Sequence, residues 1–200
     1  TLNGGDSDWV TDVAKQTSYL ENAVKPMVSR HQGSSAIFAY DVMNEIESVV
    51  GGSDGNWGVG ATWDQARAYI TAASAAIRSV DPGRLITASS GWHGYANLQK
   101  GYFSGLGLDF YDCHVYDDAG FIPDAATLGL DKPVILGEHG HTGGGNDDAR
   151  QNESLIYFLY NLSAGGWAGH AIWHYDYPGS TNTHRMVNAD GSWRPVGFTM

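Results

Sequence analysis

Cysteine, basic side chains and long apolar segments are all scarce in this chain of 200 residues. Cys113 is the single cysteine, which excludes a disulfide within the chain and a zinc site built from several cysteines. Lys and Arg number 11 against 22 Asp and Glu, and the resulting net charge of −11 opposes binding to nucleic acid or to an anionic membrane surface. No apolar run approaches the ~20 residues that a membrane-spanning helix needs. We therefore expect neither a nucleic acid nor a membrane as a partner.

Glycine and aromatic residues are abundant by contrast. The chain contains 27 Gly, nearly twice the average share of ~7%, together with 7 Trp, 11 Tyr and 6 Phe. With 42% hydrophobic residues, this composition indicates tight turns and aromatic surfaces around a packed core rather than disorder. The length suits one domain, and no low-complexity tract or linker interrupts it, so we expect a single domain over residues 1–200.

Short apolar segments alternate with helical patterns along the chain. Segments rich in β-branched and aromatic residues predict five buried strands, over 36–43, 84–89, 108–115, 133–137 and 170–173. Apolar residues at helical spacing predict helices over 12–30 (kinked at Pro26), 62–80 and 147–164, and a short helix over 124–130. This alternation predicts an α/β fold with a parallel sheet. Because no G-x-G-x-x-G turn follows a strand, we expect a partial (β/α)8 barrel of about five strands rather than a nucleotide-binding sheet.

Polar side chains lie where these strands end. The first strand is followed by Asn44 and Glu45, and Glu138 follows the fourth. The carboxyl ends of parallel strands form the rim where barrel enzymes place their active sites, so the two glutamates are candidates to face each other there. Paired carboxylates suit cleavage of a glycosidic bond, because one protonates the departing oxygen while the other attacks or stabilises the sugar. A carboxyl separation of ~5–5.5 Å gives retention through a covalent intermediate, and ~6.5–9.5 Å gives inversion.

Two of these segments carry a family resemblance. The segment 38–45, FAYDVMNE, resembles the fourth-strand motif of the retaining glycoside hydrolases of clan A, among which family 5, with its cellulases and β-mannanases, fits best. The segment 132–138, KPVILGE, resembles the seventh strand of that family. The resemblance implies that Glu45 is the acid/base, that Glu138 is the nucleophile and that Asn44 binds the sugar 2-hydroxyl.

Later strands of the family are matched as well. His114 and Tyr116 match a sixth-strand His-x-Tyr pair, and Trp173 matches the eighth-strand indole beneath the sugar at the cleavage site. The resemblance implies that His114, Tyr116 and Trp173 contact the substrate. It also implies that Tyr116 donates a hydrogen bond to the nucleophilic carboxylate and that the peptide between Trp173 and His174 is cis.

Two tryptophans lie in glycine-rich loops that follow predicted strands. Trp57 lies in the loop 51–60, and Trp92 lies in the segment 91–94. An exposed indole offers a flat apolar face to a sugar ring, so both are candidate substrate-binding residues, with packing inside the loops as the alternative.

The resemblance runs from about residue 15 to residue 195 and covers the family's strands four to eight. The first three strands of the family have no counterpart, so we expect half a barrel and a little more. The outermost strands of such a sheet carry unpaired backbone groups. We expect a second copy of the chain, as a homodimer, or a further segment to cover those edges.

These observations favour a retaining β-glycoside hydrolase that acts on a β-linked glucan or mannan, as polysaccharide or oligosaccharide, and needs no cofactor. The alternative is a non-catalytic carbohydrate-binding remnant, or an inactive fragment, of such an enzyme. A metal-dependent hydrolase is a third interpretation, because His139, His141, His170 and His174 surround Glu138, but no Asp-rich ligand set completes them and we expect no metal. A secreted location follows from the substrate class alone.

Overall fold

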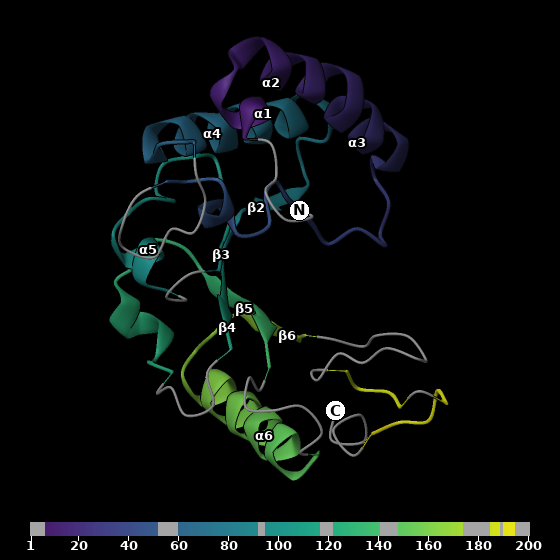
Figure 1. The fold of residues 1–200 in the computed structure, drawn as a ribbon, viewed down its shortest axis with the longest axis vertical. Coiled ribbons are helices and arrows are strands. Elements are labelled where there is room, and N and C mark those ends of the chain that lie inside the picture. The colour runs from purple at the N-terminus through teal and green to yellow at the C-terminus, as the bar shows by residue number, and fades with distance from the viewer. Residues whose placement is uncertain are drawn as a thin grey trace. The chain divides into compact units, whose positions relative to one another are not determined.

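A computed structural model describes residues 7–51, 60–91, 95–116, 122–140, 148–173, 185–188 and 190–194. The chain divides into two compact units, Thr1–Asp112 and Cys113–Met200, which we describe one at a time. Strands and helices alternate along most of the chain (Figure 1). Within the described ranges, no helix has the length and apolar character needed to cross a membrane.

The first unit begins with a helical segment whose regular geometry is interrupted near Pro26. After the short α1 (Asp8–Thr11), helix α2 (Val13–Tyr19) passes through a π-helical turn, η1 (Leu20–Val24), into α3 (Lys25–His31). The sequence predicts one helix over 12–30 with a kink at Pro26, and the irregular turn ends two residues before that proline. In the π turn the Lys25 N–H donates to the Leu20 carbonyl, five residues back. Because proline has no N–H and its ring clashes with the carbonyl four residues back, a wider turn accommodates it better than a regular α-turn.

Helix α4 (Trp63–Val80) is the longest element of the first unit and has a well-defined beginning. The Thr62 hydroxyl accepts a hydrogen bond from the Gln65 N–H, and the Gln65 side chain accepts one from the Thr62 N–H, so the two residues form a capping box. The helix packs against α1, η1 and α3. Its buried face includes Tyr69, Ile70 and Ile77, as the helical spacing over 62–80 predicts.

Each predicted apolar segment contains at least one strand. The strands are β1 (Ala39–Asp41), β2 (Leu85–Thr87), β3 (Ser89–Ser90), β4 (Tyr111–Val115), β5 (Val134–His139) and β6 (Gly169–Ile172). They form a two-stranded sheet, β1-β2, and a four-stranded sheet of order β3-β4-β5-β6. The pairs β1–β2 and β5–β6 are parallel. The parallel α/β arrangement predicted from the sequence is therefore confirmed, with one predicted strand divided into β2 and β3.

The connections between strands set where the candidate residues lie. A single 3-10 turn, η2 (Ile46–Ser48), directly follows Glu45, and the short helix α5 (Ala96–Gln99) follows β3. In the second unit a 3-10 turn, η3 (Ala125–Leu128), precedes β5, and α6 (Asp148–Ala164) lies between β5 and β6 in the chain. The core of this unit includes Leu136, Phe158 and Leu162, and Cys113 is buried there as well.

The capping box of α4 allows a direct test of this local structure. Thr62→Ala removes the acceptor of the Gln65 N–H and should lower the free energy of unfolding by about 1 kcal/mol in urea denaturation. Thr71→Ala is the matched control, because Thr71 lies at an exposed position within the same helix and alanine favours helix there. Equal effects of the two substitutions would contradict the capping role of Thr62.

Candidate active site

Glu45 lies in an unusual backbone conformation at the end of the first strand segment. Its φ of 49° and ψ of 67° are left-handed, and among the described residues it is the only non-glycine with positive φ. Such a conformation costs about 1–3 kcal/mol and persists where the surrounding structure imposes it. Here the Glu45 N–H donates to Ser89 Oγ at 3.0 Å, and the Glu45 carbonyl accepts from the Ser48 N–H at 2.9 Å. The end of β3 and the turn η2 thus hold this backbone from both sides.

Gly91 lies directly against the side chain of Glu45. A Cβ atom built on Gly91 would overlap the Cγ, Cδ and Oε1 atoms of Glu45. The residue that follows β3 must therefore be glycine for the Glu45 carboxyl to keep its position. Both residues belong to the first unit.

Glu47 is a second carboxyl of this segment that the sequence analysis did not single out. It is fully buried, and its oxygens accept hydrogen bonds from Ser90 Oγ at 2.5 Å, Asn97 Nδ2 at 2.7 Å and the Gly91 N–H at 3.1 Å. Burial raises the pKa of Glu47 above its usual value, and these hydrogen bonds partly oppose the rise. The signal in the sequence was an acidic residue among the apolar residues Ile46, Val49 and Val50, where a buried charged side chain needs partners.

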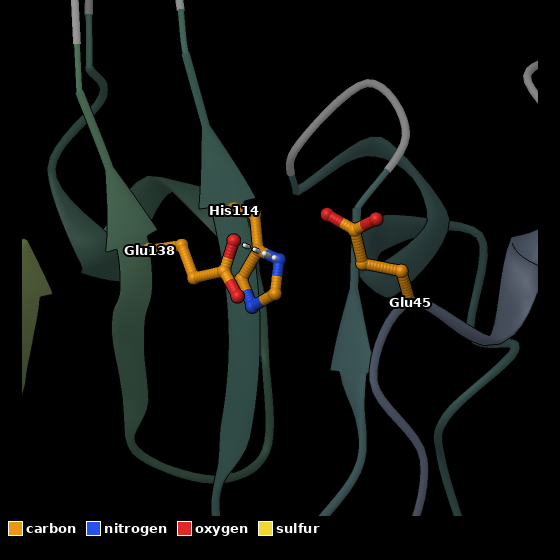
Figure 2. A group of neighbouring side chains, drawn as sticks. All are labelled: Glu45, His114 and Glu138. Atoms are coloured by element: carbon orange, nitrogen blue, oxygen red, sulfur yellow. Dashed lines mark ion pairs between the residues drawn. The ribbon is translucent and has the colours of Figure 1, made fainter. Parts of the chain in front are cut away.

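Glu138 in the second unit is held by two side chains from β4 and the residue after it. The Tyr116 hydroxyl donates a hydrogen bond to Glu138 Oε2, as the family resemblance implies. His114 Nδ1 lies 3.4 Å from the same oxygen, as the dashed line in Figure 2 marks. His114 and Tyr116 are two residues apart, so they point to the same face. His114 is buried, which leaves its ring little freedom to turn away from the carboxylate.

The pairing of β5 with β6 is irregular, as at a β-bulge, between Leu136 and His139. Leu136 pairs with His170 and His139 pairs with Ile172, so three steps along β5 correspond to two along β6. The extra residue falls within Gly137–Glu138. A bulge bends its strand and changes the direction of a side chain, and bulges often lie next to active sites. The irregular pairing therefore accounts for how a residue within β5 directs its carboxylate toward Tyr116.

His139 anchors the strand just beyond this bulge. Its ring is buried and lies 4.6 Å from the ring of Phe158, and its Nε2 lies 3.1 Å from Nδ1 of His170. The His139 carbonyl accepts the Trp173 N–H at 2.9 Å. Burial lowers the pKa of His139 from 6.5 to about 3, with a smaller contribution from His170, so this imidazole is neutral near pH 7.

Comparison with known proteins identifies the family. The model of the cellulase family, glycosyl hydrolase family 5, matches residues 4–176. The chain belongs to this family. It is 26% identical over 199 residues to a mannan endo-1,4-beta-mannosidase of Mytilus edulis. The matched region covers 79% of this chain and 53% of that protein. It is 27% identical over 208 residues to a protein of the same name from Cryptopygus antarcticus, with 84% and 52% covered.

A solved structure shows the same fold. The endo-1,4-beta-mannanase of Eisenia fetida superposes with a TM-score of 0.65 at 23% identity, over 92% of this chain and 58% of that one. The family 5 chain described here spans about half the length of the curated relatives that it matches. The predicted part of a (β/α)8 barrel is confirmed.

Of the remaining residues predicted to bind substrate, the structure describes some and not others. Asn44 is exposed beside Glu45, and Trp173 is 40% exposed directly after β6. Both have faces that solvent reaches, so each stays a candidate for contact with a sugar. Trp57, Trp92 and the peptide between Trp173 and His174 lie outside the described residues.

The histidines considered as metal ligands are only partly described. His139 and His170 face one another at hydrogen-bonding distance, so a ring nitrogen of each is occupied by the other. His141 and His174 lie outside the described residues. The absence of a metal stays a prediction.

The buried imidazole of His139 predicts a pH dependence of stability. Its folded-state pKa of about 3 is below the unfolded value of 6.5. Between these values the unfolded chain binds a proton that the folded chain does not. The contribution of His139 to stability is therefore complete above pH 6.5 and is lost as the pH falls toward 3, by about 3 kcal/mol at pH 4.

Urea denaturation between pH 4 and pH 8 measures this effect. His139→Asn, which cannot titrate, should show a smaller loss of stability on acidification than the unaltered protein. Phe158→Leu, which weakens packing against the ring but keeps the imidazole, should lower stability at every pH and keep the slope. Identical slopes for His139→Asn and the unaltered protein would contradict the assignment.

Proposed function

We propose that this chain provides both catalytic glutamates of a retaining β-glycoside hydrolase. The carboxylate of Glu138, held at a bulge by the Tyr116 hydroxyl and beside His114, is the observation that carries the proposal. A carboxylate oriented by a hydrogen bond from the Tyr116 hydroxyl suits attack on a sugar carbon, because its geometry is fixed before the substrate arrives. Membership of family 5 and the order of the strand-end motifs support the pairing of Glu138 with Glu45.

The proposed reaction has two steps. Glu138 attacks the anomeric carbon, and Glu45 protonates the glycosidic oxygen as that bond breaks, which leaves a covalent glycosyl ester on Glu138 and a carboxylate on Glu45. Glu45 then accepts a proton from water, and the water oxygen attacks the anomeric carbon and displaces Glu138. The product keeps the starting configuration, and both side chains return to their initial protonation states.

The substrate that we propose is a β-1,4-linked mannan, with β-glucan as the alternative to be assayed beside it. Support comes from the relatives in Mytilus edulis and Cryptopygus antarcticus, each named a mannan endo-1,4-beta-mannosidase. Trp173 and Asn44 are the proposed contacts to the sugar, through ring stacking and through the 2-hydroxyl. A polymer of this kind is met outside cells, which is the ground for proposing a secreted protein.

Replacement of Glu138 tests the nucleophile. Glu138→Gln keeps the size of the side chain but removes the attacking carboxylate, so turnover of mannan should fall by about 10³-fold or more. Reducing-sugar release measures turnover, and retention of configuration in the first product is followed by NMR. Glu153→Gln on the exposed side of α6 is the matched control and should leave turnover unchanged.

The alternative functions give different results in the same assay. Binding of mannan without any hydrolysis by the unaltered protein would favour the carbohydrate-binding remnant. Hydrolysis that a chelator abolishes would favour a metal-dependent enzyme. Full turnover by Glu138→Gln would contradict the proposed mechanism.

Tyr116→Phe tests the orientation of the nucleophile. Loss of a hydrogen bond to a charged group costs about 1.5–3 kcal/mol, so kcat on mannan should fall by about 10- to 100-fold while KM changes little. Tyr157→Phe, which alters a hydroxyl on α6, is the control. An unchanged kcat in Tyr116→Phe would show that the hydroxyl does not matter for catalysis.

A further inference from the structure

We propose that Glu47 is a positioning residue that holds Glu45 in its working conformation. The proposal rests on the function proposed for Glu45 as acid and base. Glu47 has no part in the two-step reaction, yet it is a carboxyl with no exposed surface. Burial of such a group is unfavourable unless hydrogen bonds compensate it. A buried carboxyl that takes no part in the reaction therefore needs a structural explanation.

The hydrogen bonds of Glu47 connect the turn after Glu45 to the segment after β3. Glu47 is the middle residue of η2, the turn that begins directly after Glu45. Its Oε1 accepts from Ser90 Oγ and from Asn97 Nδ2 in α5, and its Oε2 accepts from the Gly91 N–H. One side chain thus joins η2, the end of β3 and α5, all within the first unit.

The same segment contacts Glu45 at two points. Ser89 Oγ accepts the Glu45 N–H, and Ser89 is itself fixed by hydrogen bonds to the Met43 carbonyl from its N–H at 3.1 Å and its hydroxyl at 3.3 Å. The Gly91 backbone lies against the Glu45 carboxyl. Glu47 is hydrogen-bonded to both Ser90 and Gly91, and Gly91 is the residue against which the Glu45 side chain lies.

The left-handed backbone of Glu45 makes this support necessary. A glutamate released from its surroundings favours negative φ, because positive φ brings its Cβ close to the backbone. A change of that dihedral swings the carboxyl away from its position. Displacement by about 1 Å can cost about 100-fold in rate. Loss of the Glu47 hydrogen bonds therefore affects the acid/base more than the rest of the site.

Glu47→Gln is the decisive variant. It keeps the size of the side chain, but its amide nitrogen cannot accept a hydrogen bond, so at least one of the three donors loses its acceptor. Ser90→Ala removes one donor and leaves the carboxyl intact. Ile70→Val, a buried change in α4 of the same unit, is the control for general destabilisation. Thermal denaturation establishes that each variant is folded.

The readout compares leaving groups. Mannan has a poor leaving group that needs an acid, whereas a 2,4-dinitrophenyl β-mannobioside releases a phenolate that needs none. For Glu47→Gln we expect kcat on mannan to fall by about 10- to 100-fold with little change in KM. The rate at which the aryl substrate releases its phenolate in the first step should fall less than about 3-fold. Ser90→Ala should show the same pattern more weakly, and Ile70→Val should show no such difference between substrates.

The outcomes separate this proposal from the function on which it rests. Equal losses on both substrates, or no loss on either, in Glu47→Gln and Ser90→Ala would overturn the positioning role. If the unaltered protein cleaves neither substrate, the proposed function fails. Crystal structures of the unaltered protein and of both variants then decide the positioning role. A shift of residue 45 to negative φ in the variants would support it, and an unchanged φ would overturn it.

Discussion

The left-handed backbone at Glu45 is the constraint on which the position of this candidate carboxylate depends. A non-glycine residue keeps this conformation only where its neighbours impose it. The neighbours here are Ser89, which accepts the Glu45 N–H, and Gly91, whose missing Cβ leaves room for the carboxyl. Ser89 lies in β3 and Gly91 directly follows that strand, and the buried Glu47 is hydrogen-bonded to Ser90 and Gly91. The buried Glu47 therefore helps to set the position of the half-buried Glu45, two residues before it in the chain.

The second unit uses a different irregularity for a similar purpose. Glu138 lies at a bulge in β5, and the residue after it, His139, is a buried polar side chain that joins β5 to β6 through His170. In both units a candidate catalytic carboxylate lies where the backbone is irregular. A buried polar residue within two positions, Glu47 in the first unit and His139 in the second, stabilises that backbone. Regular strands direct alternate side chains to opposite faces, so departures from regularity are a means of directing a side chain elsewhere.

Most of the fold could be predicted from the sequence, because buried parallel strands leave continuous apolar runs that a short window detects. The division of one run into β2 and β3 could not, since nothing in the apolar pattern marks Ala88 as a break. Glu45 and Glu138 were found through their flanking motifs. Glu47 was missed because its partners Ser90 and Asn97 lie more than 40 residues away in the chain. The only indication of the bulge in the sequence is Gly137, because glycine within a strand often marks a bulge.

The strained conformation of Glu45 has a consequence for how this chain evolves. Glycine adopts positive φ without penalty, and asparagine does so more readily than glutamate. Either replacement would relieve strain and raise heat resistance while removing the acid. Screening for thermostability alone would therefore enrich descendants that lack the proposed acid, and simultaneous selection for saccharide release would be needed to retain the acidic residue.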